Sequence, residues 1–272
     1  MFDEAPLPRH SLLQDPAFEA ALRACGQTPV RLESGHLILR QRVLGMPLAM
    51  LPRAAPPPDL TAQVRRAGLQ RLPLILSPER PSPLPPAVPL RGACQLAVWD
   101  ISGSVGTRRA RLHQKWRNQL RKAEMSDLCL HEGRLPPDPA DPILQAAAQH
   151  AAAHRYTLWP APLTAAFAHA APAQTQLFQA RLNGAPVANM LFLTHGDQAT
   201  YHFGQTSDKG RAHAAHNLIL WRAAEALSAR GIKAIDLGRV DGQSPTLDRF
   251  KLRTGAQRQK TGGTYLHWRP WA

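Results

Sequence analysis

Apolar and polar positions in the first hundred residues alternate between helical and strand spacing. Asp15-Pro16 predicts the start of a helix, because aspartate is a preferred N-cap and proline is favoured at the first helical position, and Gly26 marks its end. Two apolar-polar stretches around Ser34-Gly35 then predict a short antiparallel meander. The elements expected here are a helix at 16–25, strands within 27–51, a helix from Asp59 to Gly68, and strands at 72–77 and 94–102 around a proline-rich loop at 77–92.

The segment 107–124 has the most distinctive helical pattern, with an apolar stripe made of Leu112, Trp116, Leu120 and Ala123. Residues 108–122 also contain seven Arg or Lys and no acid. A solvated helix usually gains stability from mixed charges at i,i+4 spacing. We therefore expect this helix to face an anion such as phosphate, and the alternative is a plain solvated basic face.

The second half predicts a hairpin, a helix and a parallel return strand. Asn183-Gly184 lies between two apolar runs, which is the strongest short-range hairpin signal, and Gly196-Asp197 predicts the next turn. A helix at 215–230 ends at Gly231 and leads into a strand, as in a β-α-β unit. The other expected elements are helices at 141–154 and 163–170, strands at 175–182, 185–193, 198–205 and 233–238, a polar loop at 207–214, a loop and short helix at 241–255, and a last strand at 259–268.

Composition adds a basic excess that is concentrated in one part of the chain. The 272 residues carry 33 Lys and Arg against 19 Asp and Glu, a net charge of +14. Residues 1–105 contribute 11 basic and 8 acidic side chains, whereas residues 106–272 contribute 22 and 11. This distribution favours a polyanionic partner for the second part, such as the phosphates of coenzyme A, a nucleotide-linked substrate or tRNA. A solvated basic surface is the alternative.

Several classes of protein are disfavoured by what the sequence lacks. No run approaches the roughly 18 apolar residues needed to span a bilayer, so we expect no membrane insertion. The N-terminal segment is acidic where an export signal is basic, and Cys25, Cys94 and Cys129 are isolated, so we expect a cytoplasmic chain without disulfides. No motif for metal ligation, nucleotide binding by a glycine-rich loop or serine hydrolase chemistry is found, so we expect no metal.

Five segments of the second half carry a family resemblance: KWRNQLRKAE (115–124), FQARLNGAPVANMLFL (178–193), TYHFGQTS (200–207), HNLILWRAAEALSARGIKAIDLG (216–238) and LDRFKLRTGA (247–256). In this order they resemble the Fem-type branch of the GNAT superfamily, which includes peptidyltransferases. The resemblance implies an α/β (α+β) fold with a mixed, mostly antiparallel sheet flanked by helices. It also implies two lobes in tandem, a degenerate GNAT-like lobe at 1–105 and a catalytic lobe at 106–272 that includes the basic helix.

The resemblance places a donor site just before the helix at 215–230. In the superfamily this loop gives backbone N–H groups to the pyrophosphate of coenzyme A. Gly210 and Ala212 match the expected spacing, whereas Ser207 stands where Arg or Gln is usual, and Fem-type enzymes commonly take an aminoacyl-tRNA instead. The implied donor-binding residues are Gln205, Ser207, Lys209, Gly210, Arg211, Ala212 and Asn217.

Lys251 takes the position of a Fem-type lysine that points to substrate phosphates or to charge developing in the transition state. An amine must also lose a proton before it attacks a carbonyl. Asp241, Asp236 and His202 are the candidate catalytic groups, although Asp236 could equally be a structural carboxylate, and Tyr201 and His202 should point to opposite faces of a strand. Further phosphate or substrate contacts are expected from Lys115, Arg117, Arg239 and Arg253.

These observations lead to one preferred function and two alternatives. The first is transfer of an acyl group from acyl-CoA to an amine of a small-molecule or amino-acid-like acceptor. The second is a Fem-type aminoacyltransferase that uses charged tRNA, whose backbone the basic helix would contact. The third is a non-catalytic module that binds anions or nucleic acid. The sequence does not indicate the acceptor or the oligomeric state.

Overall fold

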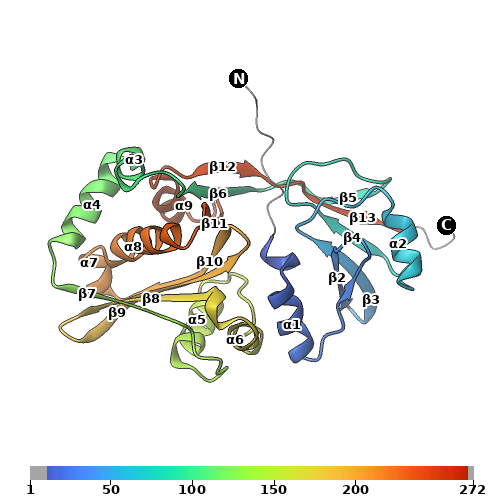
Figure 1. Ribbon diagram of the computed structural model, residues 1–272, viewed down its shortest axis with the longest axis horizontal. Helices are drawn as coiled ribbons and strands as arrows, with labels where there is room; N and C mark the ends of the chain where they lie inside the picture. The colour runs from blue at the N-terminus through green and yellow to red at the C-terminus, as the bar shows by residue number, and fades with distance from the viewer. Residues whose placement is uncertain (1–10, 269–272) are drawn as a thin grey trace. The chain divides into compact units, whose positions relative to one another are not determined.

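The computed structural model describes residues 11–268, and Figure 1 shows its helices and strands coloured by residue number. Within these residues the chain forms two compact units, a larger one at 97–258 and a smaller one made of 11–96 and 259–268. The chain therefore crosses between the units twice, whereas the sequence predicts a single boundary near residue 105. Most of the N-terminal segment from which we expect no export signal lies outside the described residues.

The smaller unit is a mixed sheet with helices at its start and middle. Its elements are η1 (Leu12–Gln14), α1 (Pro16–Ala24), β1 (Val30–Arg31), β2 (Leu37–Val43), β3 (Met46–Pro52), α2 (Leu60–Arg66), β4 (Leu74–Ser77), β5 (Val88–Arg91) and β13 (Thr264–His267). The strand order is β1-β2-β3-β4-β13-β5, in which β3 and β4 run parallel. Leu51 and Leu76 of the sheet pack against Leu60 and Val64 of α2 in its core. The predicted helix, meander, helix and strand are confirmed.

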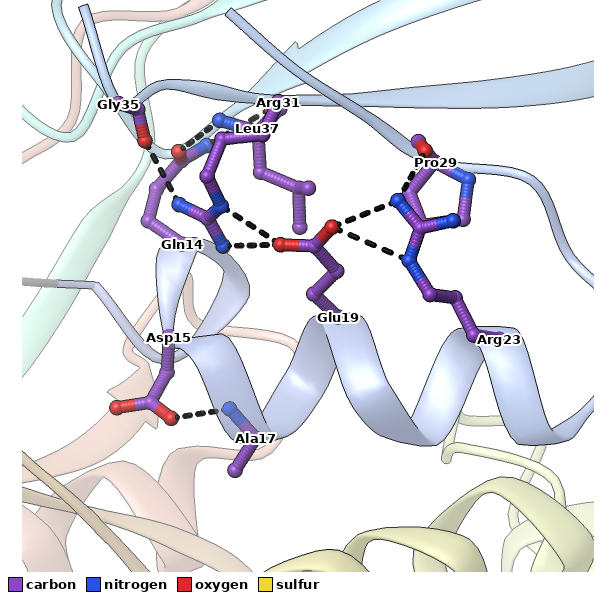
Figure 2. A network of polar contacts seen from close by, with 9 residues as sticks. All are labelled: Gln14, Asp15, Ala17, Glu19, Arg23, Pro29, Arg31, Gly35 and Leu37. Carbon is purple, nitrogen blue, oxygen red and sulfur yellow. Dashed lines mark hydrogen bonds and ion pairs between the residues drawn. The ribbon is translucent and has the colours of Figure 1, made fainter.

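Polar contacts join η1 and helix α1 to the sheet of this unit (Figure 2). The Gln14 side chain accepts a hydrogen bond from the Leu37 N–H at 2.7 Å and donates to the Pro52 carbonyl oxygen at 2.6 Å. Glu19 binds Arg23 at 2.8 Å and Arg31 at 2.6 Å. Although partial burial opposes ionisation, these two guanidinium groups hold the pKa of the Glu19 carboxyl below its ordinary value of 4.5.

Replacing Glu19 with glutamine is expected to lower the free energy of unfolding at pH 7 by about 1–2 kcal/mol, because two charge-assisted contacts are lost. A carboxyl whose pKa is lowered by folding stabilises the protein above its unfolded pKa and loses that effect as the pH falls through the folded pKa. The gap between the variant and the unmodified chain should therefore close as the pH falls below 4.5, as measured by denaturant unfolding at several pH values. Glu33→Gln, which disrupts an exposed pair with Arg66, is the matched control, and an equal loss there would contradict this account.

The larger unit is built on a sheet of order β12-β6-β11-β10-β9-β8-β7 (Figure 1). The strands are β6 (Gln95–Asp100), β7 (Leu128–Gly133), β8 (Thr175–Leu182), β9 (Ala185–His195), β10 (Gln198–Thr206), β11 (Ala234–Arg239) and β12 (Gln257–Lys260). The helices are α3 (Val105–Arg111), α4 (Gln114–Glu124), α5 (Pro142–Ala153), α6 (Ala161–Ala170), η2 (Pro172–Gln174), α7 (Asp208–Ala212), α8 (Ala215–Ala229) and α9 (Pro245–Leu252). In its core, Trp99 of β6 and Trp221 of α8 lie with ring centroids 6.3 Å apart.

Local sequence signals in this unit are confirmed at the turns and caps. Asn183 and Gly184 both have positive φ, and the antiparallel strands β8 and β9 pair directly on either side of them. The Asp141 carboxylate accepts a hydrogen bond from the Ile143 N–H at 2.8 Å and caps α5. β10 and β11 run parallel with α8 between them, as the β-α-β pattern predicts.

Four predicted segments differ from the structure. The segment 107–124, expected as one helix, forms the end of α3 and the whole of α4, because the backbone is extended at Leu112 and His113. The imidazole Nδ1 of His113 accepts a hydrogen bond from the Lys115 N–H and caps α4. The expected last strand at 259–268 is divided between β12 and β13, which belong to different sheets and are separated by Gly262-Gly263. The proline-rich loop contains β5, and the polar loop at 207–214 contains α7.

Among residues 11–268, none of the helices combines the length and the apolar character needed to cross a bilayer.

Candidate active site at the carboxyl end of β11

The central strands of the larger unit separate part of the way along their length. β10 and β11 pair through Gln198–Thr200 and Ala234–Asp236, and the pairing ends there although both strands continue. On its other side, β10 stays paired with β9, with a bulge at His202 between Tyr201 and Phe203. The backbone beyond Thr200 on β10 and beyond Asp236 on β11 is thus released from the ladder between these two strands. Carboxyl ends of strands at such a change of pairing are common ligand sites in α/β proteins.

Lys251 of α9 lies at this end of β11. Its side chain is only 7% exposed, and its ammonium donates a hydrogen bond to the Arg239 carbonyl oxygen at 2.8 Å. Burial lowers the pKa of Lys251, while the negative charges of Asp248, Asp236 and Asp241 act in the opposite direction. Gly238 has a φ of +82°, and a side chain there would begin 3.6 Å from the Lys251 Nζ atom. Any side chain at position 238 would therefore lie directly against the buried cation.

The charge of Lys251 interacts with three carboxylates, and each of these accepts a hydrogen bond from a backbone N–H. Asp236 accepts from Gly238 at 2.7 Å, and Asp248 accepts from Gly242 at 2.8 Å. Asp241 accepts from Gln243 at 3.2 Å and pairs with the Arg239 guanidinium at 3.0 Å. The hydrogen bond from Gly238 is the backbone contact that a structural role of Asp236 requires. Asp241 is the exposed member of the three carboxylates. The structure brings together four of the residues predicted from sequence, Lys251, Asp236, Asp241 and Arg239.

His202 has different neighbours. Its Nε2 atom lies 3.2 Å from the Thr164 hydroxyl, and its ring meets the Trp159 ring edge to face at 4.9 Å. Burial lowers the pKa of His202 to about 3, so the imidazole is neutral at physiological pH and accepts a proton weakly. This geometry favours packing against α6 over a role as a general base. Burial also raises the pKa of the neighbouring Tyr201.

The segment expected to hold the donor forms a turn of helix. The Ser207 hydroxyl caps α7 by accepting the Gly210 N–H at 3.2 Å, and the Arg211 N–H binds the Ser207 carbonyl oxygen at 2.9 Å. The Arg211 guanidinium binds the Thr206 carbonyl oxygen at 2.9 Å and pairs with Asp208. Lys209 and Ala212 are exposed, and Asn217 is buried in the first turn of α8.

The pyrophosphate of coenzyme A would need free backbone N–H groups at a glycine of this segment. The N–H groups of Gly210 and Arg211 are both engaged within the turn. A Cβ atom at Gly210 would collide with the Val187 carbonyl oxygen and the Thr206 hydroxyl. Gly210 therefore has a packing reason to be glycine, and its amide and that of Arg211 do not fit a pyrophosphate cradle.

Replacing Gly210 with alanine is expected to lower the free energy of unfolding by about 1–3 kcal/mol, because the added methyl group must displace backbone atoms of β9. Thermal or urea unfolding measures the loss. Gly106→Ala is the matched control, since its nearest neighbour would be 3.9 Å away and alanine favours an exposed helix. A Gly210→Ala variant as stable as the unmodified chain would show that the contact with Val187 is not tight.

Phe250, next to Lys251 in the chain, connects α9 to two other helices. Its ring lies 6.1 Å from Trp116 of α4 and 6.5 Å from His216 of α8, measured between centroids. His216 donates through Nε2 to the Gln205 carbonyl oxygen at 2.8 Å, and the His113 N–H at the start of α4 donates to the Arg253 carbonyl oxygen at 2.9 Å. The basic helix α4 is therefore held beside the helix that carries Lys251.

The basic face of α3 and α4 is partly neutralised, which corrects the expectation of seven unpaired cations. Arg108 is buried and donates to the Ile101 and Gly103 carbonyl oxygens, both at 2.6 Å, and to the Ser228 hydroxyl. Arg109 binds Glu124 and lies over the Trp221 ring, and Arg111 pairs with Asp100 at 3.4 Å. The four remaining cations are on α4, and within residues 11–268 none of them forms an ion pair: Lys115, Arg117, Arg121 and Lys122.

The sequence did not indicate the surroundings of His202 or the buried role of Arg108. Trp159 and Thr164 lie about forty residues before His202 in the chain, and no spacing rule links them. Arg108 was grouped with the other cations because its partners are backbone carbonyl groups, which leave no signal in the sequence.

Among the described residues, no group of three His, Cys, Asp or Glu side chains is placed to hold a metal ion.

Comparison with known proteins identifies the family. A sequence profile described as the acetyltransferase (GNAT) domain matches residues 108–252, more than half of the chain. No curated protein matches the sequence. Solved structures with a similar fold include FemX (TM-score 0.74, 11% identity, 97% of this chain and 93% of that one). Another is the C-terminal domain of a provisionally named lysylphosphatidylglycerol synthetase from Agrobacterium fabrum (TM-score 0.59, 14% identity, 93% and 87%). The predicted GNAT-like fold with two lobes is confirmed. The chain therefore belongs to the GNAT acetyltransferase family and has the fold of its Fem-like branch.

Proposed function

We propose that this chain transfers an aminoacyl group from an aminoacyl-tRNA to the amine of a small acceptor, the second of the two donors considered from the sequence. The observation that carries the proposal is that the backbone N–H groups of Gly210 and Arg211 already donate hydrogen bonds to Ser207 within the helical turn. A donor that needs no pyrophosphate cradle is compatible with this turn. The proposed donor is a cytoplasmic molecule, in keeping with the location expected from the sequence.

The charges on α4 support an RNA donor. Lys115, Arg117, Arg121 and Lys122 occupy little more than two turns of helix, and none of them is neutralised by a carboxylate within the described residues. Such a group of cations suits a polyphosphate backbone, where each contact releases a bound counterion. These four cations lie on α4, which packs beside α9 through the contact between Trp116 and Phe250.

The chemistry assigned to the strand end is nucleophilic attack of the acceptor amine on the ester carbonyl of the donor. A bond forms between nitrogen and the carbonyl carbon, and the ester bond to the terminal ribose oxygen breaks. The amine loses one proton, for which Asp241 is the exposed carboxylate, and the ribose oxygen gains one. The Lys251 ammonium stabilises the negative charge that develops on oxygen, because a buried cation acts in a poorly screened environment.

The donor can be tested by binding and transfer with both candidates. We expect aminoacyl-tRNA to bind with an affinity that falls steeply as salt increases, and a labelled amino acid to move to an amine from a panel of acceptors. Acetyl-CoA is expected to bind weakly or not at all under the same conditions. Saturable binding of acetyl-CoA together with no effect of added tRNA would overturn the proposed donor and restore the acyl-CoA alternative.

A further inference from the structure

The turn between β2 and β3 has an unusual residue at its tip. Leu44 and Gly45 have φ values of +50° and +80°, nearly the same as Asn183 and Gly184 in the hairpin of the larger unit, +50° and +79°. Asparagine and glycine tolerate this left-handed backbone, whereas leucine is disfavoured in it. The chain thus uses the favoured pair in one hairpin and a strained leucine in the other.

The same tip exposes a group of apolar side chains. Leu44 is 94% exposed, Met46 65% and Val43 47%. These three side chains are exposed to solvent. The 94% exposure of Leu44 means that packing contacts do not compensate for its strained backbone. Exposed apolar groups that occur together at a protruding point indicate an interaction site more often than single exposed side chains do.

Cations stand next to this apolar tip. Arg40 and Arg42 are exposed on β2, and the Arg42 guanidinium lies 3.4 Å from the Gly45 carbonyl oxygen. No acidic residue occurs in the whole hairpin, 37–52. The tip is therefore apolar at its end and positively charged at its base.

We propose that the β2–β3 hairpin docks the chain on a membrane surface rich in anionic phospholipid. The apolar end would enter the boundary between headgroups and acyl chains, and the two arginines would meet lipid phosphates. An exposed apolar tip suits a fluid bilayer, because a bilayer has no fixed shape that the tip must match. This is shallow interfacial binding, which differs from the bilayer-spanning insertion that the sequence disfavours. The inference goes beyond the proposed transferase activity and does not depend on it.

The first test is sedimentation of the full chain with vesicles of phosphatidylcholine alone, or of phosphatidylcholine with phosphatidylglycerol. Binding is expected with the anionic vesicles only. Leu44→Asn should weaken that binding about tenfold or more, since it removes one inserted leucine. The variant should fold at least as stably as the unmodified chain, because asparagine suits the turn. Met125→Ser, which changes an 82% exposed methionine on the larger unit, is the matched control and should bind like the unmodified chain.

A second variant reports insertion directly. The added indole in Leu44→Trp should shift its fluorescence to shorter wavelength with anionic vesicles and not with phosphatidylcholine vesicles. The proposal is overturned if anionic vesicles do not bind the chain, or if Leu44→Asn binds them unchanged, which would assign the binding to net charge. It is also overturned if Leu44→Asn dissociates a dimer, because a second copy of the chain would then cover the tip. Donor binding by Leu44→Asn should be unaffected, so failure here is separate from failure of the proposed function.

Discussion

Replacement of Lys251 with alanine is expected to lower the rate of aminoacyl transfer by about 100-fold or more while donor binding changes little. The ammonium is buried beside the end of β11, and such a group stabilises developing negative charge far more than it stabilises the bound substrate. The rate constant under saturating donor and the donor dissociation constant should be measured separately. Because Lys251 is needed as an ammonium, activity should also fall as the pH rises through its lowered pKa.

Loss of folding must be distinguished from loss of chemistry at this position. Lys251→Met keeps most of the aliphatic volume and removes the charge together with the hydrogen bond to the Arg239 carbonyl oxygen. It should therefore remain folded, as a thermal unfolding curve would show, and still be inactive. Arg249→Ala removes an exposed cation from the same helix and should keep nearly full activity. If Lys251→Met transfers normally, the site proposed at the end of β11 is wrong. If the unmodified chain binds aminoacyl-tRNA but transfers nothing to any acceptor, the non-catalytic binding module is the better account of the chain.

The second large effect is expected on tRNA binding when the four cations of α4 that form no ion pair are removed. Changing Lys115, Arg117, Arg121 and Lys122 together to glutamine is expected to weaken binding of aminoacyl-tRNA by about 100-fold at low salt. The slope of log affinity against log salt should fall by about 3, because each phosphate contact contributes a little less than one unit. Filter binding or fluorescence titration over a range of salt concentrations measures both quantities.

A variant with the same loss of charge separates a specific surface from general attraction. Arg40, Arg42, Arg65 and Arg71 are exposed on the smaller unit, and their joint replacement by glutamine removes four positive charges as well. It should weaken donor binding much less than the α4 variant. Equal effects would mean that net charge alone attracts tRNA, and α4 would lose its proposed role.

Local signals in the sequence predicted those parts of the fold that are fixed by neighbouring residues. Asn183-Gly184 imposes a turn with positive φ at two positions, and Asp141-Pro142 caps a helix within three residues. The break in the helix at 107–124 was missed, because Leu112 and Trp116 are both buried and keep their helical spacing across it. Its only mark is the side-chain cap of His113, which is a weak signal.

The candidate site shows the same limit more strongly. Lys251, Asp236 and Asp241 come from α9, β11 and the loop between them, so their proximity follows from the order of elements. Gly210 matched a phosphate-binding spacing, yet its close approach to Val187 depends on a strand more than twenty residues earlier. The partners of Arg109 and Arg111 are likewise 15 and 11 residues away. Spacing along the chain cannot distinguish a glycine that approaches a ligand from one that approaches its own backbone.

The position of β13 has a consequence for how the chain acquires its structure during synthesis. β13 lies between β4 and β5, and its register pairs Leu266 with both Ile75 and Val88. These two strands therefore have no shared neighbour until residue 267 has left the ribosome, whereas the residues of the larger unit have all emerged before then. The part of the chain that is translated first is thus the part whose sheet is completed last, and a nascent chain that stops before β13 would expose the open edges of β4 and β5 to other strands.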